Sequence, residues 1–105
     1  MSRPANPMRG EAAIHVGGER LVLRPTFEAL VAAEEELGSL FALVERAAEG
    51  RLALSEIAAL FWHCVFERPE GCTKARIGAA LTEGGLTKAT PMLTMLLTQI
   101  LQGRV

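Results

Sequence analysis

Several residue types are missing or scarce in this chain of 105 residues. It has no Asp and no Tyr, and its three Ser are Ser2, Ser39 and Ser55. The last two are expected to cap helices, so a hydrolytic triad would have no convincing Ser nucleophile. The two Cys, Cys64 and Cys72, do not suggest a disulfide framework by number or spacing. We therefore expect reduced thiols in a cytoplasmic protein.

The sequence motifs that mark common catalytic and cofactor sites are also absent. No GxxxxGKS/T or GxGxxG phosphate loop occurs, and neither does the GxSxG turn of hydrolases or a zinc-protease pattern. Glu34, Glu35 and Glu36 are consecutive, so they fan out over a helix surface and predict a solvated face rather than an acid–base pair. We expect no catalysis, no catalytic residue and no cofactor.

A metal site is not expected either. His63, Cys64 and Cys72 are the side chains that come nearest to a set of soft ligands. Adjacent helical residues point about 100° apart, so His63 and Cys64 cannot easily share one ion. His15 would have to complete a zinc set from a different predicted element. The sequence instead predicts Cys64 in the core, His63 on a helix flank and Cys72 in a loop.

The charge balance gives no reason to expect nucleic-acid binding. The formal net charge is −1, whereas nucleic-acid-binding domains usually carry a strongly basic patch and exposed aromatic side chains. Residues 1–25 carry four Arg against two Glu, and residues 28–50 carry six Glu against one Arg. The basic patch is therefore predicted to face the acidic segment, either within the chain or in a neighbouring one.

The order of the elements predicts an α+β fold that is mainly α, with an N-terminal β-hairpin followed by four or five short helices. Residues 1–10 are polar, contain two Pro and lack the apolar stretch of a signal peptide. We expect them to form a flexible arm, followed by a single small domain over residues 11–105.

The hairpin is the clearest local signal. Two alternating runs flank the Gly-Gly pair at residues 17–18, which suits a two-residue turn because glycine tolerates positive φ. The turn sets a register in which Ile14 faces Leu21 and Glu11 faces Arg24. One face is then apolar and is expected to be buried: Ala12, Ile14, Leu21 and Leu23.

The helices are predicted from capping residues and apolar spacing. Their first turns are expected after Thr26, Ser39, Ser55, Thr73 and Thr90, with Pro91 at the first position of the last helix and Gly103 past its end. The side chains expected to face the core are Phe27, Leu30, Val31 and Leu37 in the first helix, Leu40, Phe41, Val44 and Ala48 in the second, and Ile57, Leu60, Phe61, Cys64 and Val65 in the third.

The last helix is the most apolar part of the chain. The stretch "PMLTMLLTQIL" runs from Pro91 to Leu101 without a charged residue. Thr and Gln side chains interrupt it, so it falls short of a membrane span. Half of all residues are apolar, which is more than so small a domain is expected to hide. We therefore expect a surface for a protein partner or for self-association into a homo-oligomer.

This partner-binding surface is predicted to combine the last helix with one side of the third helix. Methionine suits such a surface because its flexible side chain adapts to varied partners. The residues predicted to form it are Trp62, Phe66, Met92, Leu93, Met95, Leu96 and Ile100.

The order of these motifs resembles a known family. The segments "RGEAAIHVGGERLVLRPTFEALVAAEEELG" and "SLFALVERAAEGRLALSEIAALFWHCV" resemble the small gene-transfer-agent and phage tail proteins, which include tail tube and tail assembly chaperone proteins. The resemblance covers roughly residues 9–102. It is carried by Gly10-Glu11, the Gly17-Gly18 turn, Leu23-Arg24, Leu30, Glu34 to Leu37, Gly38 and Leu54-Ser55.

The resemblance implies a role in tail assembly without catalysis. A tail assembly chaperone would bind the helical, apolar tape-measure protein until the tube polymerises around it. The alternative is a structural tail component, but tube proteins are mostly β, and one hairpin is too little sheet for a tube ring. A small regulatory or nucleic-acid-binding module is the third reading of the residues. No membrane partner is expected.

Overall fold

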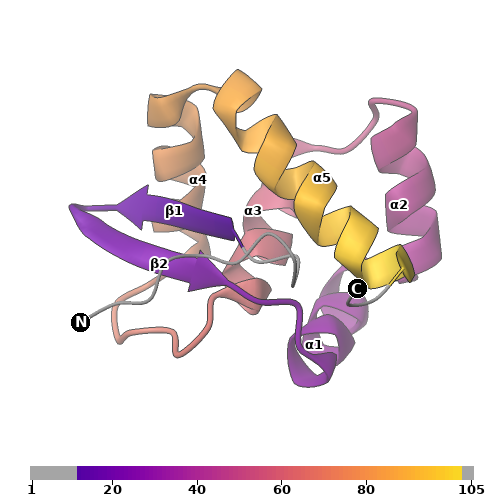
Figure 1. Ribbon diagram of the computed structural model, residues 1–105, viewed down its shortest axis with the longest axis horizontal. Helices are drawn as coiled ribbons and strands as arrows, with labels where there is room; N and C mark the ends of the chain where they lie inside the picture. The colour runs from indigo at the N-terminus through magenta and orange to yellow at the C-terminus, as the bar shows by residue number, and fades with distance from the viewer. Residues whose placement is uncertain (1–11, 103–105) are drawn as a thin grey trace.

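The computed structural model describes residues 12–102, which form a two-stranded antiparallel hairpin followed by five helices. Figure 1 shows α5 crossing the molecule from α4 to the ends of α1 and α2. The fold is therefore α+β and mainly α, as predicted. The elements are β1 (Ala12–Val16), β2 (Glu19–Leu23), α1 (Phe27–Leu37), α2 (Leu40–Ala48), α3 (Leu54–Cys64), α4 (Lys74–Gly84) and α5 (Leu86–Gln102).

The hairpin has the predicted register, with Ile14 opposite Leu21. Gly17 and Gly18 form the turn with φ of 58° and 81°, which β-carbon-bearing residues rarely adopt. The expected pairing of Glu11 with Arg24 involves residue 11, which lies outside the described residues. The predicted apolar face is buried, and its members are Ala12, Ile14, Leu21 and Leu23.

The second strand is joined to the segment that follows α3. The N–H of Arg24 donates to the carbonyl oxygen of Cys64 at 2.6 Å, and the N–H of Phe66 donates to that of Val22 at 2.8 Å. Leu23 and Val65 pair between these two bonds. An isolated hairpin is marginally stable in water, so these bonds and the buried face hold it on the helices.

The core gathers around α3, which contributes more buried residues than any other described helix. Each of the other helices adds one or two residues to the buried core. The largest fully buried side chains are Phe61, Leu23, Leu43, Leu60, Ile77, Leu96 and Cys64.

Helices α1 and α2 begin at the predicted caps, and the predicted Leu30, Leu37 and Leu40 pack against the core, but other residues predicted to face inward do not. The Thr26 hydroxyl accepts from the N–H of Ala29 at 3.1 Å, as expected of an N-cap. The expectation that Phe27 and Val31 face the core is wrong, because both side chains are exposed and Ala33 is the buried residue of α1. A small residue at that place lets α1 approach α3 closely.

In α2 the buried residue is Leu43, and the inward orientation predicted for Phe41 and Ala48 is wrong. Residues 40–44 are all apolar, so their spacing did not identify one face. In the folded chain Leu43 is the residue of this run that is buried in the core, whereas Phe41 has an exposed fraction of 74%.

The start predicted for α3 is also wrong. The helix begins at Leu54 and its N-cap is Ala53, so Ser55 lies inside the first turn. The carboxylate of Glu56 replaces the missing cap, because it accepts from the N–H of Ala53 at 3.0 Å. This is the acidic half of a capping box.

The last helix starts earlier than predicted, at Leu86, so Pro91 lies inside it and Thr90 is not its cap. The Thr90 hydroxyl instead donates to the carbonyl oxygen of Leu86 at 3.0 Å. Ala89, which precedes Pro91 by two residues, is buried in the core, so the first turns of α5 are part of the packed fold. The predicted end at Gly103 lies outside the described residues.

Two clusters of charged side chains fasten α1 and α2 to the other helices. Glu36 lies 2.6 Å from Nζ of Lys74 and 2.7 Å from Nε2 of His63. Glu56 accepts from Arg46 at 2.8 Å through one oxygen and at 2.6 Å through the other. The hydrogen bond from Lys74 lowers the pKa of Glu36, and that from Arg46 lowers the pKa of Glu56.

We expect Leu96→Ala to lower the free energy of unfolding by about 2–5 kcal/mol, because the side chain is fully buried. Leu101→Ala is the control on the same helix, and its cost should stay near or below about 0.5 kcal/mol because the side chain is exposed. Urea denaturation measures both. An equal decrease in the free energy of unfolding for the two variants would show that α5 does not pack as described.

We also expect stability to fall as the pH drops below 4.5, the ordinary Glu pKa. Both carboxylates have a depressed pKa in the folded state, so the unfolded state takes up their protons first. Their contribution is present above that pH and is lost as the pH falls through the folded-state values. Urea midpoints of the Glu36→Gln/Glu56→Gln variant should therefore fall less steeply than wild type between about pH 5 and 3. Glu45→Gln, whose side chain lies in neither cluster, should keep the wild-type slope; the same slope for the double variant would contradict the expectation.

Candidate functional site

An apolar groove lies between α1, α2 and the C-terminal end of α5. Its volume is about 200 Å³, and one carboxylate stands among its aliphatic and aromatic side chains. Figure 1 shows the three helices converging at this place. The residues that line the groove are Leu30, Glu34, Leu40, Phe41, Val44, Ile100 and Leu101.

The short turn between α1 and α2 fixes one wall of the groove. Gly38 has a φ of 88°, and its N–H donates to the carbonyl oxygen of Glu34 at 2.9 Å. Oε2 of the same Glu34 accepts from the N–H of Leu40 at 3.1 Å. The Ser39 hydroxyl accepts from the N–H of Ala42 at 3.3 Å. These bonds satisfy helix-end N–H and C=O groups, so this wall of the groove is preformed.

The opposite wall depends on how α5 is anchored. Leu96 is fully buried, and one turn later Ile100 and Leu101 reach the groove. Residues four apart on a helix lie on the same side, so burial of Leu96 also directs Ile100 toward α1 and α2. Leu101 keeps an exposed fraction of 52%, which leaves this end of the groove open.

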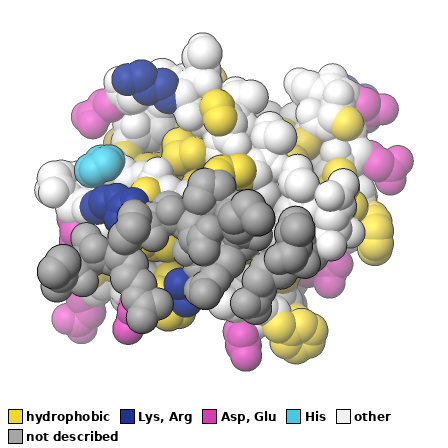
Figure 2. Space-filling model, viewed as in Figure 1, with side chains coloured by type: hydrophobic (Ala, Val, Ile, Leu, Met, Phe, Trp, Pro, Cys, Tyr) yellow, Lys and Arg dark blue, Asp and Glu magenta, His cyan; other side chains and the backbone are white. Residues whose placement is uncertain are grey.

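Exposed hydrophobic side chains extend the groove along α1 and α2. Phe41 lines it, and on α1 the exposed residues Phe27 and Val31 lie within one turn of the groove residues Leu30 and Glu34. Phe27 has an exposed fraction of 79%. Figure 2 shows hydrophobic side chains at the surface where Figure 1 places α1 and α2. Contiguous exposed apolar surface of this kind marks interaction sites in soluble proteins.

The residues predicted to form the partner-binding surface do not lie together. Met92, Leu93 and Met95 pack against the core, and Leu96 is inside it. Ile100 lines the groove. The partner-binding role of these residues stays a prediction, but most of the apolar surface of α5 is used within the fold.

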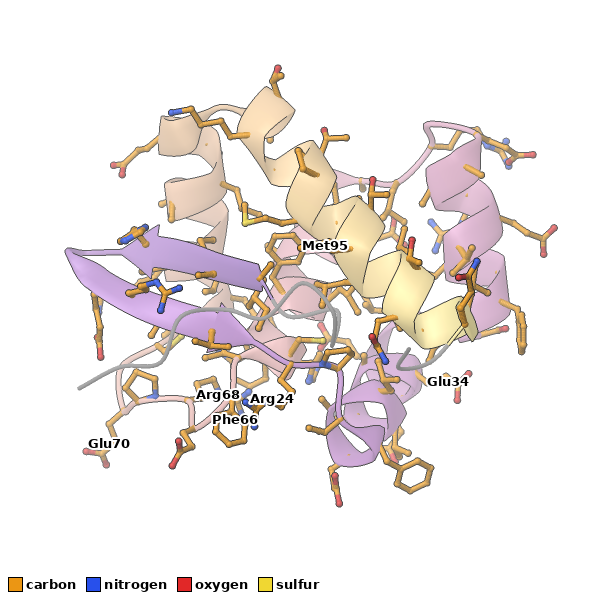
Figure 3. The ribbon with its side chains drawn as sticks, in the orientation of Figure 1. Arg24, Glu34, Phe66, Arg68, Glu70 and Met95 are labelled. Carbon is orange, nitrogen blue, oxygen red and sulfur yellow. The ribbon has the colours of Figure 1, made fainter. Side chains whose placement is uncertain are left out.

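Trp62 and Phe66 each lie against a cationic side chain. The Arg68 guanidinium stacks 3.6 Å from the centre of the Trp62 ring, and that of Arg24 stacks 3.9 Å from the centre of the Phe66 ring. Figure 3 shows Phe66, Arg68 and Arg24 together, well apart from Met95. Because each contact stabilises its aromatic ring by about 0.5–1 kcal/mol at exposed sites, a partner would have to displace them.

The groove was not predicted from the sequence, because its apolar side chains on α1 and α2 were assigned to the core. Leu30, Leu40, Phe41 and Val44 were all expected to face inward. The available signal was the run of five apolar residues at 40–44, since a helix cannot direct five consecutive side chains to one face. Part of that run must therefore be exposed.

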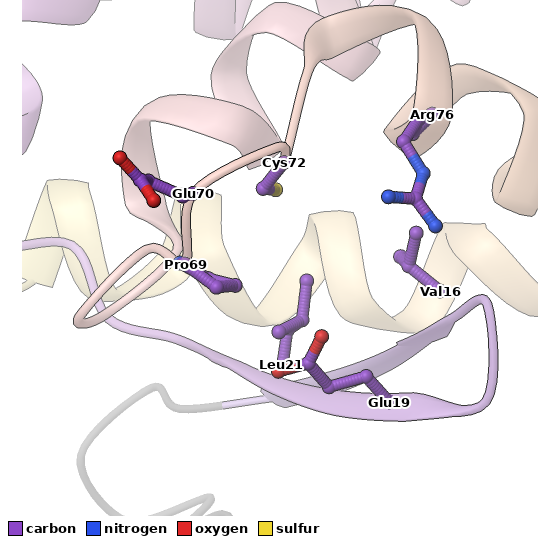
Figure 4. A pocket seen from close by; sticks show the side chains of 7 residues that line it. All are labelled: Val16, Glu19, Leu21, Pro69, Glu70, Cys72 and Arg76. Carbon is purple, nitrogen blue, oxygen red and sulfur yellow. The ribbon is translucent and has the colours of Figure 1, made fainter.

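The two thiols lie in different environments, and neither belongs to a metal cluster. Within residues 12–102, no group of three His, Cys or Glu side chains is placed to hold an ion. Burial raises the pKa of the Cys64 thiol to about 12, and burial also raises the pKa of Cys72. Cys72 lines a small cavity of about 20 Å³, which has room for about one water molecule. Figure 4 shows Cys72 in this cavity with Arg76 and Glu70.

These features define a small, mainly helical protein with a preformed apolar groove. No described helix combines the length and hydropathy that crossing a bilayer requires. A family model described as phage tail tube protein, GTA-gp10, matches residues 9–103. The chain belongs to this family of phage and gene-transfer-agent tail proteins, which confirms the resemblance. Neither a curated protein nor a solved structure matches the chain.

We expect the two thiols to react at very different rates. With a thiol-specific disulfide reagent at about pH 8, Cys72 should be modified in the native protein, because Cys64 is buried and its pKa is raised. Cys64 should react only at the rate of unfolding, and the Cys72→Ser variant should show no fast phase. If both thiols of the native wild-type protein react with the reagent at the same rate, the burial of Cys64 described here is wrong.

Proposed function

We propose that this chain is a tail assembly chaperone. It would hold an apolar helical segment of the tape-measure protein in the groove between α1, α2 and α5 until the tail tube polymerises. This is a binding function without catalysis. The observation that carries the proposal is the preformed groove, with the exposed Phe41 at its edge, in a member of a tail protein family.

The shape of the groove favours a helical protein segment as ligand. Small-molecule sites usually enclose about 300–1,000 Å³, and this groove, at about 200 Å³, is smaller. The groove is open to solvent, and the exposed side chains of Phe27 and Val31 extend its apolar surface. An amphipathic helix binds such a groove by inserting side chains spaced three or four residues apart.

The strength of binding expected from this surface suits a transient complex. Full burial of one exposed Phe or Leu side chain contributes about 1.5–3 kcal/mol. Phe41 and Leu101 therefore supply a few anchoring contacts, which are offset by the cost of association. A dissociation constant in the micromolar range, about −8 kcal/mol, allows the assembling tube to displace the chaperone.

A structural tail component is the second candidate, and the description of the family as tail tube protein favours it. A tube ring needs strands that pair between subunits. Within residues 12–102 the sheet has two strands, and the segment around Val65 already pairs with β2. Mass spectrometry of purified particles separates the candidates, because a chaperone should be absent from them or strongly substoichiometric.

We expect the tagged chain to retain the tape-measure protein when the two are co-expressed. Phe41→Ala should weaken this complex by about 2 kcal/mol, or roughly 30-fold, because the aromatic contact that becomes buried on binding is lost. Leu86→Ala, which changes another exposed hydrophobic residue outside the groove, should bind like wild type. Isothermal titration with the purified partner measures the affinities.

Phe66→Ala is the informative comparison in the same experiment, because Phe66 belongs to the surface predicted from the sequence. If Phe66→Ala abolishes binding and Phe41→Ala does not, the groove is the wrong site. If wild type does not retain the tape-measure protein and is present stoichiometrically in particles, the chaperone proposal fails.

A further inference from the structure

We infer that the segment bound in the groove is an amphipathic helix whose apolar stripe is flanked by Lys or Arg side chains. The inference rests on the proposed function and adds the charge of the partner segment. It is carried by the juxtaposition of the apolar groove with an excess of acidic side chains on the two helices that form it.

The acidic charge of the chain is concentrated on α1 and α2. Residues 28–50 hold six Glu and one Arg, although the whole chain has a net charge of only −1. The single Arg46 does not offset this excess at the groove, because it forms its ion pair with Glu56 of α3. The groove therefore lies in a locally negative part of the surface.

Four of the six carboxylates are placed beside the apolar surface. Glu34 lines the groove, and its Oε2 accepts a hydrogen bond from the N–H of Leu40. On α1, Glu28 and Glu35 lie three and four residues from the exposed Val31, so they border it on the helix surface. On α2, Glu45 follows Phe41 by one turn.

The two remaining carboxylates of this segment are engaged elsewhere. Glu36 lies against Lys74 and His63, and Glu49 pairs with Arg51 at 2.9 Å. The charges available to a partner are thus the four near the groove. Figure 3 shows Glu34 beside the end of α5.

An uncharged apolar helix would be a poor match for this site. Covering the groove removes water from Glu34, and a desolvated carboxylate without a cationic partner is unfavourable. Lys or Arg side chains at the edges of the apolar stripe would replace that water with ion pairs. They would also attract the partner to the groove before contact, and acidic helices would be rejected.

Two fluorescent model peptides test the inference. Both carry the same leucine stripe at helical spacing; one has Lys and the other Glu on either side of it. Anisotropy should show the Lys peptide binding wild type at least about ten-fold more tightly at about 0.1 M NaCl. Raising the salt to about 1 M shortens the Debye length from about 10 Å to about 3 Å, so the preference should shrink to roughly three-fold or less.

Two triple variants identify the carboxylates responsible. Glu34→Gln/Glu35→Gln/Glu45→Gln should lose the preference for the Lys peptide. Glu67→Gln/Glu70→Gln/Glu83→Gln removes the same number of charges from exposed positions outside the groove and should keep it. Circular dichroism melts establish that both variants fold. Equal binding of the two peptides to wild type, or equal loss of preference in both variants, overturns the inference.

The results separate this inference from the proposed function. If the tape-measure protein is retained through Phe41 but the peptides are not distinguished by charge, the chaperone function stands and the inference fails. If the Lys peptide binds selectively through the groove carboxylates but the tape-measure protein is not retained, the charge preference of the groove stands and the chaperone function fails.

Discussion

The burial of α3 is the interaction on which the other elements depend. Phe61 and Leu60 are fully enclosed, the backbone after Cys64 pairs with β2, and α1 and α4 pack directly on this helix. The other two helices pack on these elements, α2 on α1, and α5 on α4 and β1. Each of the other helices contributes only one or two buried residues to the core, such as Ala33 in α1 and Leu43 in α2. The rest of their apolar side chains are therefore left for the surface.

The parts of the fold that were predicted correctly are those fixed by local chemistry. The Gly-Gly turn fixed the register of the hairpin, and the hydroxyls of Thr26 and Thr73 accept from the N–H groups three residues later, as N-caps do. The predictions that failed depended on tertiary contacts. Nothing in the sequence around Pro91 indicates that α5 begins more than one turn earlier, at Leu86.

The groove was harder to predict than the fold because three separate segments form it. Ile100 was identified as a partner-binding residue, but Leu30 and Phe41 come from helices more than fifty residues earlier in the chain. The sequence showed an excess of apolar residues and indicated that some would be exposed. It did not show which apolar residues would be exposed, because a run of five apolar residues in α2 fits several orientations of the helix equally well.

The environment of Trp62 has a practical consequence for spectroscopy. It is the only tryptophan in the chain, its indole N–H donates to the carbonyl oxygen of Cys72 at 2.8 Å, and the Arg68 guanidinium covers its ring. It does not line the groove. The fluorescence of Trp62 should therefore report global unfolding of the protein but should not change when a ligand binds in the groove. A binding titration therefore needs a fluorescent label on the ligand.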